Sequence, residues 1–292
     1  MKNTLITIVG PTAIGKTALS LQLANHFKSD IISCDSRQFY KEMTIGTAVP
    51  TIDEQNAAKH HFIQNRSIFE DYNVGQFERD ALTKLNDLFL ENPIQIMVGG
   101  SGLYVDAVLK GKKLTIELEE KGIESLQKKL QKLDIETYNT IALENPHRIM
   151  RALEICIGTG KTYAEFKNKP KKKRNFKSMK IGLTADREII YDRINKRVDL
   201  MVENGLIEEA QKLLQHKNLN ALQTVGYREL FSYFNNDFTK EFAISEIKKN
   251  TRRFAKRQTT WFKRDEKTLW FDYKTDIKKI IAEIENKLIY ER

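Results

Sequence analysis

The stretch GPTAIGKT, residues 10–17, lies between an apolar run at residues 4–9 and a helical pattern at residues 16–27. Its spacing, G-x-x-x-x-G-K-T, is that of a phosphate-binding loop. In such a loop, backbone N–H groups point inward and the dipole of the following helix adds positive charge. The predicted phosphate-binding residues are Gly10, Pro11, Thr12, Ala13, Ile14, Gly15, Lys16 and Thr17.

Two side chains of this loop have a predicted role of their own. Lys16 reaches phosphate oxygens, and the hydroxyl of Thr17 can ligate Mg²⁺. The loop therefore predicts that phosphates are bound, but it does not identify the molecule that carries them.

Strand and helix patterns alternate around the loop. Short β-branched runs at residues 30–34 and 94–98 are typical of strands buried on both faces. Helical periodicity covers residues 76–92, a further strand pattern covers 179–185, and we expect a last strand at residues 268–273. We therefore predict an α/β fold with a phosphate-loop core of parallel strands and helices on both faces.

The sequence between 113 and 177 has a different character, because helical patterns at 117–133 and 145–158 follow each other with no strand between them. Asn145 and Pro146 make a good helix start, and Gly158 and Gly160 a good stop. We predict a catalytic core of residues 1–112 and 178–292, interrupted by a helical insertion domain at 113–177.

Composition restricts the setting of the protein. With 292 residues the chain can form a full core, and its net charge is +10. We find no signal peptide and no apolar window near the ~20 residues of a membrane helix, so we expect no membrane association. Cys34 and Cys156 form no metal spacing and fit a reducing cytoplasm.

Two basic blocks, KPKKKRNFK at 169–177 and KKNTRRFAKRQTTWFKR at 248–264, suggest a polyanionic partner. For the first block, a solvated loop is an equal alternative. In the second, Ile247, Phe254 and Trp261 recur every seven residues, and we expect this apolar seam to pack in the core. A basic ridge beside it, suited to phosphate-backbone contacts, comprises Lys249, Arg253, Arg257 and Arg264.

An acidic residue follows the second predicted strand. Asp35 is a candidate general base, with a turn cap beside Ser36 as the alternative. The strand at 94–98 ends in GGSGLY, where a motor-type ATPase would be expected to place its Mg²⁺-organising acid. Glycines at that point suit the close approach of a flat or bulky ligand.

Nine motifs in order along the chain carry a family resemblance. They are GPTAIGKT, DSRQFYKEMTIGTA, HHFI, NVGQFERDA, GGSGLY, PHRIMRALEI, DREIIYDRI, VGYREL and FAKRQTTWFKR. With them the sequence closely resembles the tRNA dimethylallyltransferase family, enzymes that prenylate an adenosine next to the anticodon. It departs from the family pattern at Ile14, Val49 and Ser101, none of which changes a charge needed for catalysis.

The resemblance implies a reaction and its participants. A five-carbon allyl group passes from dimethylallyl diphosphate to N6 of the adenine, and diphosphate leaves intact with Mg²⁺ as cofactor. Thr17 would ligate the metal and Asp35 would accept the amine proton. We choose Arg197 first and Arg228 second to face the diphosphate, with a structural ion pair as the alternative for each.

The resemblance also implies contacts with the tRNA anticodon stem-loop. The base must leave its stack to react. The residues expected around it are Asp35, Ser36, Arg37, Gln38 and Ser101, and a second contact is expected at His147, Arg148, Ile149, Met150 and Arg151. Without the resemblance, this second segment would be interpreted as an exposed helix face.

Two other functions remain alternatives to the prenyl transferase. A small-molecule or nucleoside kinase shares the loop, the parallel sheet and an acid after the second strand. A non-catalytic RNA-binding module is disfavoured by the intact phosphate loop. We expect a monomer.

Overall fold

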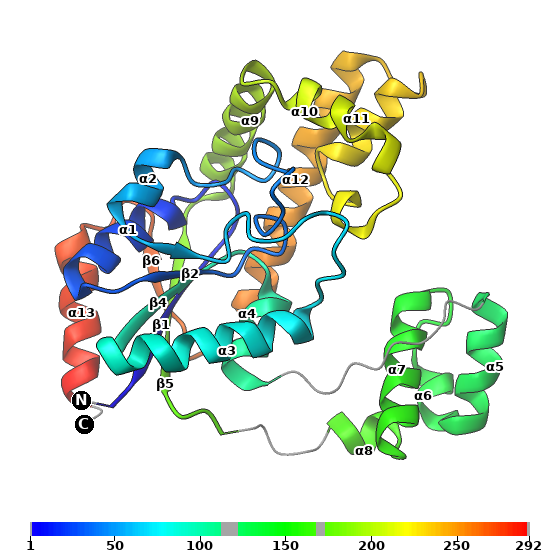
Figure 1. Cartoon of the computed structure of the whole chain (residues 1–292), viewed down its shortest axis with the longest axis horizontal. Helices are drawn as coiled ribbons and strands as arrows, with labels where there is room; N and C mark the ends of the chain where they lie inside the picture. Colours follow the sequence, from blue (N-terminus) through cyan, green and yellow to red (C-terminus); the bar gives the residue numbers. More distant parts are fainter. Residues whose placement is uncertain (1, 112–121, 168–172, 291–292) are drawn as a thin grey trace. The chain divides into compact units, whose positions relative to one another are not determined.

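The computed structural model describes residues 2–111, 122–167 and 173–290. Its core is a sheet of parallel strands in the order β3-β2-β4-β1-β5-β6 (Figure 1). The strands are β1 (Thr4–Val9), β2 (Ile31–Ser33), β3 (His60–His61), β4 (Ile94–Val98), β5 (Lys177–Thr184) and β6 (Leu269–Asp272). The predicted α/β fold is confirmed, as are the five strands expected from the sequence.

Strand β3 was missed, because two residues carry no periodicity. It pairs with β2 through Ile31 and His60. Strand β1 lies in the middle of the sheet, and the chain adds strands first on the β4 side and then on the β5 side. Ligands of parallel sheets bind beyond the carboxyl ends of the strands at such a reversal. The loop at residues 10–15 follows β1 at this point.

Helices pack on both faces of the sheet. The helices of this part of the chain are α1 (Lys16–Phe27), α2 (Ile52–Ala57), α3 (Val74–Glu91), α4 (Gly102–Lys110), α9 (Arg187–Glu203), α10 (Leu206–Lys212), α11 (Tyr227–Phe234), α12 (Lys240–Phe262) and α13 (Ile277–Tyr290). Ile6 and Ile8 of β1 pack with Leu23 of α1 and Ile284 of α13. Helix α3 covers the opposite face (Figure 1). The alternation of side chains along a strand explains why both faces need cover.

A second hydrophobic cluster lies among α9, α10, α11 and α12. It contains Val198, Leu206, Tyr227 and Ile247, all at most 2% exposed. Met43, from the segment that follows β2, belongs to the same cluster and is fully buried. This packing brings helices from the last third of the chain into contact with the segment that follows β2.

Contacts divide the chain into two compact units, one of Met1–Val105 with Asn175–Arg292 and the other of Asp106–Arg174. The second unit includes the helices α5 (Ile123–Leu133), α6 (Ile135–Thr140), α7 (Pro146–Thr159) and α8 (Tyr163–Lys167). It has its own core around Leu126, Leu130 and Leu153.

The predicted start and stop of α7 are confirmed. The Asn145 side chain accepts a hydrogen bond from the N–H of Arg148, Pro146 occupies the first turn, and Gly160 ends the helix at φ 64°. Asp186 occupies the N-cap position of α9, and its side chain makes no capping hydrogen bond.

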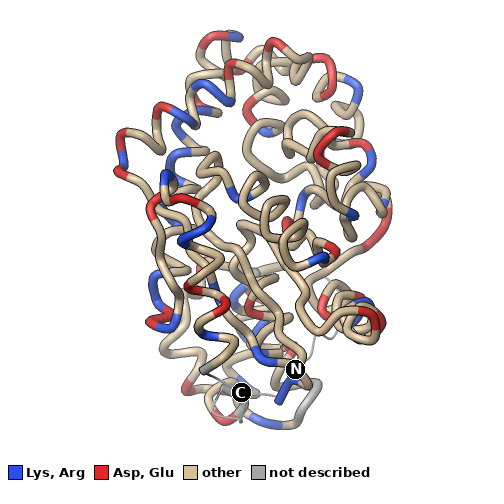
Figure 2. The backbone as a smooth tube through the Cα atoms, turned by 90° about the vertical axis from the view of Figure 1, so that its left-hand side faces the viewer, with Lys and Arg blue, Asp and Glu red and all other residues tan. Residues whose placement is uncertain are grey.

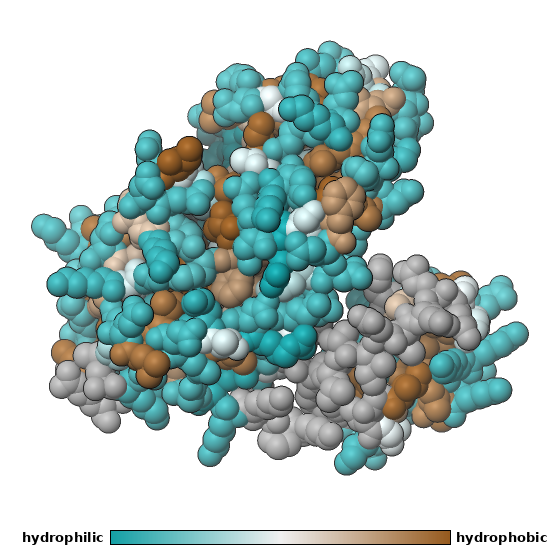
Figure 3. Space-filling view, in the orientation of Figure 1, coloured by the Kyte–Doolittle hydropathy of each residue, from teal (hydrophilic) through white to brown (hydrophobic). Residues whose placement is uncertain are grey.

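Hydrophilic side chains predominate on the face shown in Figure 3, with hydrophobic side chains in small groups between them. Among the helices of the described ranges, none combines the length and the apolar character that crossing a membrane requires.

Candidate active site

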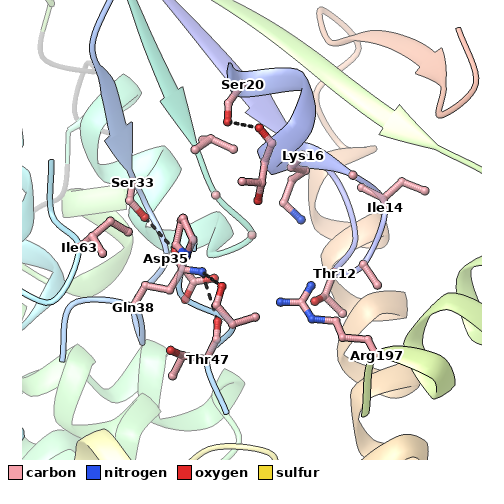
Figure 4. Close-up of a pocket in the computed structure, with 18 of the residues that line it drawn as sticks. Thr12, Ile14, Lys16, Ser20, Ser33, Asp35, Gln38, Thr47, Ile63 and Arg197 are labelled. Atoms are coloured by element: carbon pink, nitrogen blue, oxygen red, sulfur yellow. Dashed lines mark hydrogen bonds between the residues drawn. The ribbon is translucent and has the colours of Figure 1, made fainter. Parts of the chain in front are cut away.

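The phosphate loop opens into a cavity of about 420 Å³, which we call the first cavity. Its wall includes residues 12–17 of the loop, and Lys16 and Thr17 begin α1 there. Figure 4 shows Lys16 and Arg197 on one side of this cavity and Asp35 across from them. The expected phosphate site is therefore a hollow that begins at a helix N-terminus.

Hydrogen bonds from distant residues hold the loop in its conformation. Ala13 has φ 63°, and its carbonyl accepts a hydrogen bond of 2.7 Å from Nε of Arg193 in α9. The N–H of Thr12 donates to Oε1 of Gln258 in α12 at 2.8 Å. The Lys16 ammonium donates to the carbonyls of Gly10 and Pro11 at 3.1 and 2.8 Å. The carbonyls of Gly10 and Pro11 therefore hold the Lys16 ammonium in position.

Two enclosed cations, Lys16 and Arg197, line the first cavity, and neither forms an ion pair with a described residue. Burial and the nearby guanidinium of Arg197 lower the pKa of Lys16 to about 8, against the opposing influence of Asp35. Burial also lowers the pKa of Arg197. Arg197 forms no hydrogen bond or ion pair with any described residue. Two enclosed cations that repel each other favour an anion between them.

The lowered pKa of Lys16 predicts how anion affinity depends on pH. Below about pH 8 Lys16 is protonated before the ligand arrives. Above that pH, binding must also take up a proton, because a bound anion raises the pKa of the ammonium. Affinity for inorganic diphosphate, measured by calorimetry, should fall on the order of tenfold between about pH 7.5 and about pH 9.5.

The Lys16→Arg variant is the control, because arginine keeps its charge over this range. The titration of diphosphate itself affects both proteins equally. Parallel pH curves for the two proteins would contradict the lowered pKa.

Asp35 lies just beyond the end of β2 and lines the first cavity. Its Oδ1 accepts a hydrogen bond of 3.0 Å from the N–H of Arg37. This is the turn-capping contact that the sequence offered as an alternative, so Asp35 caps a turn and faces the cavity at once. Among the described residues it is the only carboxylate that lines this cavity.

A second cavity, of about 580 Å³, adjoins the first. The residues that line both are Thr12, Asp35, Thr47, Gly100 and Arg197. The only carboxylate of the described chain in either cavity, and one of the two enclosed cations, therefore lie where the two spaces meet. A ligand in each cavity would bring two reactants together at this junction.

The seam of Ile247, Phe254 and Trp261 does not pack as expected. Ile247 is 2% exposed, but Phe254 and Trp261 are 38% and 36% exposed, and all three line the second cavity. The prediction of core packing is wrong for the two aromatic residues. Their rings, with Tyr104, offer flat surfaces on which a base can stack.

Protein groups occupy the space beside the glycines of GGSGLY. A Cβ on Gly99 would collide with the backbone of Cys34, and one on Gly100 with the Gln258 amide. A Cβ on Gly102 would collide with the indole of Trp261. These glycines allow α12 and the end of β2 to approach the turn after β4. Gly99 and Gly100 also line the first cavity, so the close approach of a ligand to this turn stays a prediction.

Residues predicted to surround the acceptor base divide into two groups. Ser36 and Ser101 both line the second cavity, and their hydroxyls lie 3.1 Å apart. Arg37 also lines it, but its guanidinium donates to the carbonyls of Asn220 and Ala221.

The amide of Gln38 is engaged within the protein. Its Nε2 donates to the carbonyls of Thr47 and Ala48, and its Oε1 accepts from Ser33. Arg228, the second choice for the diphosphate, lines the second cavity and is absent from the described lining of the first.

The segment of residues 147–151 lies in α7 of the second compact unit. Arg148 is exposed, Met150 is half-buried and Arg151 forms an ion pair of 2.8 Å with Glu154. The Ile149 side chain is fully buried in the core of this unit, so it supports the helix from within, and the tRNA contact expected for residues 147–151 stays a prediction. His147 is the second residue of α7.

The basic ridge of α12 is exposed at Arg253, Arg257 and Arg264, whereas Lys249 forms an ion pair with Glu246. Arg257 lies over the ring of Phe254 and Arg264 over that of Trp261, at 5.6 and 5.4 Å from the ring centres. Elsewhere blue and red segments alternate along the tube in Figure 2. Of the block at 169–177, residues 169–172 lie outside the described residues.

Sequence reasoning missed Gln258, whose side chain joins two parts of the site. Besides the Thr12 contact, its Nε2 donates to the carbonyl of Gly100 at 3.0 Å. The residue was present in the motif FAKRQTTWFKR, but nothing in the motif identifies its partners.

The donor atoms around the first cavity decide whether it suits a metal ion. Among the described residues no group of three or more His, Cys, Asp or Glu side chains could hold a metal ion. The Thr17 hydroxyl lines the first cavity and makes no hydrogen bond to a described residue. Mg²⁺ binds in many sites through one or two protein oxygens, substrate phosphates and water, so this donor set fits it.

Known proteins were compared with the whole chain. A family model described as IPP transferase matches residues 38–265. A tRNA dimethylallyltransferase of Flavobacterium psychrophilum is 61% identical over 98% of this chain and 99% of that protein.

Solved structures share the fold. A tRNA isopentenylpyrophosphate transferase from Bacillus halodurans is 37% identical, with a TM-score of 0.74 over 99% of this chain and 96% of that one. A eukaryotic dimethylallyltransferase acting on tRNA is 26% identical, with a TM-score of 0.88 over 100% of this chain and 80% of that one. These matches confirm the resemblance carried by the sequence motifs. The chain belongs to the tRNA dimethylallyltransferase family.

Proposed function

We propose that the protein transfers the dimethylallyl group of dimethylallyl diphosphate to N6 of the adenosine on the 3′ side of a tRNA anticodon. One observation carries this proposal. A cavity that begins at a phosphate loop meets a second, aromatic-lined cavity at Asp35 and Arg197. Family membership supports tRNA as the acceptor, because the relatives are named as enzymes acting on tRNA.

The first cavity would hold the donor. Lys16, the loop N–H groups and Arg197 would bind the diphosphate, whose negative charge grows as the allylic C–O bond breaks. Donors already aimed at the departing oxygens lower the barrier because they need no rearrangement. Lys16 and Arg197 are enclosed, which strengthens their interaction with the leaving group.

The second cavity would hold the adenine after it leaves its stack. The exocyclic amine is a poor nucleophile, because its lone pair is delocalised into the ring. As the N6–C1 bond forms, Asp35 would accept the proton that N6 loses. The electron pair of the broken C–O bond leaves with the diphosphate, so atoms and charges balance.

Thr17 would hold Mg²⁺ together with the diphosphate oxygens. When bound, the ion neutralises charge on the leaving group. The hydroxyl of Thr17 at the N-terminus of α1 has no hydrogen-bond partner among the described residues, which supports this assignment.

The kinase alternative is not favoured. The relatives that match nearly the whole chain are named dimethylallyltransferases. A monomeric state and a cytoplasmic location stay predictions from the sequence.

A product assay tests the proposed function. The purified chain, unmodified tRNA and labelled dimethylallyl diphosphate should give tRNA labelled at one adenosine, identified as N6-isopentenyladenosine after digestion. Chelation of Mg²⁺ should lower the yield strongly, because the charge on the diphosphate is then left without its metal.

Labelled ATP in place of the prenyl donor is the control and should label neither tRNA nor added nucleosides. Transfer of the γ-phosphate, or label at a base other than adenine, would contradict the proposal.

A further inference from the structure

The lining of the first cavity combines cationic and apolar side chains. Lys16 and Arg197, with Thr17, provide its cationic side, and its apolar residues include Ala48, Pro50 and Ile63. We call these last three residues the apolar wall. Figure 4 shows Ile63 across the cavity from Lys16 and Arg197. A ligand that matches both sides has an anionic end and a short apolar end.

The apolar wall is built from backbone conformations that side chains disfavour. Ala48 has φ 50°, and Ile63 lies between Phe62 at φ 65° and Gln64 at φ 45°. Such conformations persist where surrounding contacts hold them, and they concentrate at ligand sites. Gln38 contacts the backbone at both of these places. Its Nε2 donates a hydrogen bond to the carbonyl of Ala48, and its own carbonyl accepts one from the N–H of Gln64.

The carboxylate of Glu209 holds residues 44–46, the segment that leads to Ala48. Oε2 of Glu209 in α10 accepts hydrogen bonds from the N–H groups of Thr44 and Ile45 at 2.9 and 2.8 Å. Its Oε1 accepts from the N–H of Gly46 at 2.9 Å and from the Tyr227 hydroxyl at 2.6 Å. Four donors on one carboxylate make a strong anchor.

The Tyr227 side chain also packs closely against this segment, at Gly46. It is fully buried, and a Cβ placed on Gly46 would lie 2.6 Å from its hydroxyl. Neither Glu209 nor Tyr227 is among the residues that line the two cavities. They therefore act on a bound ligand only through the segment that they hold.

We propose that the apolar wall restricts the donor to a five-carbon allyl group, and that Glu209 and Tyr227 are positioning residues that keep the wall in place. This inference rests on the proposed function. The diphosphate is held at the cationic side, so each added isoprene unit would extend the tail toward the wall. A wall held by several hydrogen bonds does not recede to admit it.

The test compares two allylic donors, dimethylallyl diphosphate and the ten-carbon geranyl diphosphate, by kcat/KM with a tRNA anticodon stem-loop. Ile63→Ala removes three carbons from the wall. The ratio of geranyl to dimethylallyl kcat/KM should rise about tenfold or more, as expected when a pocket changes by a few methylene groups. Ile63→Val is a milder change in the same direction and should raise the ratio less.

Tyr227→Phe removes one donor from Glu209 and leaves the ring in place. It should raise the KM for dimethylallyl diphosphate and raise the same ratio by a smaller factor. General destabilisation lowers both kcat/KM values alike and leaves their ratio unchanged. The ratio therefore separates positioning from mere structural support.

Two matched controls should keep the wild-type ratio. Ile52→Ala makes the same truncation at a residue that is 76% exposed on α2, and Tyr233→Phe makes the same change elsewhere on α11. If the wild type transfers the dimethylallyl group but Ile63→Ala and Ile63→Val keep its ratio, the wall does not set chain length. If Tyr227→Phe alone keeps the ratio, the positioning role is overturned. If the wild type transfers no allyl group, the proposed function itself fails.

Discussion

Replacing Asp35 by Asn should lower the rate of prenyl transfer by about 10²–10⁴-fold, the usual contribution of a general base. Asn keeps an oxygen that can accept the hydrogen bond from the N–H of Arg37, so the turn after β2 should survive. What the amide cannot do is take a proton from N6. Since no other carboxylate of the described chain lines either cavity, no neighbour can replace it.

Single-turnover kinetics with both substrates saturating would measure this effect directly, alongside the affinity for tRNA. Affinity should stay near the wild-type value. Asp53→Asn, an exposed residue on α2 outside both cavities, is the matched control and should leave the rate unchanged. If tRNA affinity falls as much as the rate, Asp35 is a binding residue and the base must be sought elsewhere.

Replacing Lys16 by Ala should lower kcat/KM for dimethylallyl diphosphate by about 10²–10³-fold, as the loss of one aimed charge at a departing oxygen does. Both KM and kcat should change. The diphosphate is already anionic when it binds, so KM rises, and its charge increases as the C–O bond breaks, so kcat falls. The enclosure that lowers the pKa of Lys16 also makes its charge more effective.

Steady-state kinetics at several donor concentrations would resolve the two constants. Lys59→Ala removes a lysine whose side chain is 73% exposed and lies outside both cavities, and it should leave both constants unchanged. A Lys16→Ala variant with normal kinetics would exclude residues 10–17 as the donor site.

Much of the fold could be predicted from local pattern. The apolar run at residues 4–9 forms β1 and the helical pattern at residues 16–27 forms α1, each within the bounds that the sequence predicts. Buried parallel strands are continuous apolar runs, which explains why β1, β2 and β4 were found and the two-residue β3 was not.

Periodicity does not say what a helix face meets. The seven-residue spacing of Ile247, Phe254 and Trp261 shows correctly that they share a face of α12. Only the assembled core shows that this face turns from the buried cluster at Ile247 toward a cavity at Phe254 and Trp261. Burial is a property of the surroundings, and it changes along one stripe.

The sequence by itself determined the phosphate loop, because its function needs only eight consecutive residues and the start of the next helix. The tertiary structure alone decided which distant residues complete the site. Thr12 meets Gln258 across 246 positions, and Arg197 lines the same two cavities as Asp35 although more than half the chain separates the two residues. Strand order and helix packing produce such meetings, and no local pattern encodes a distance between residues that far apart.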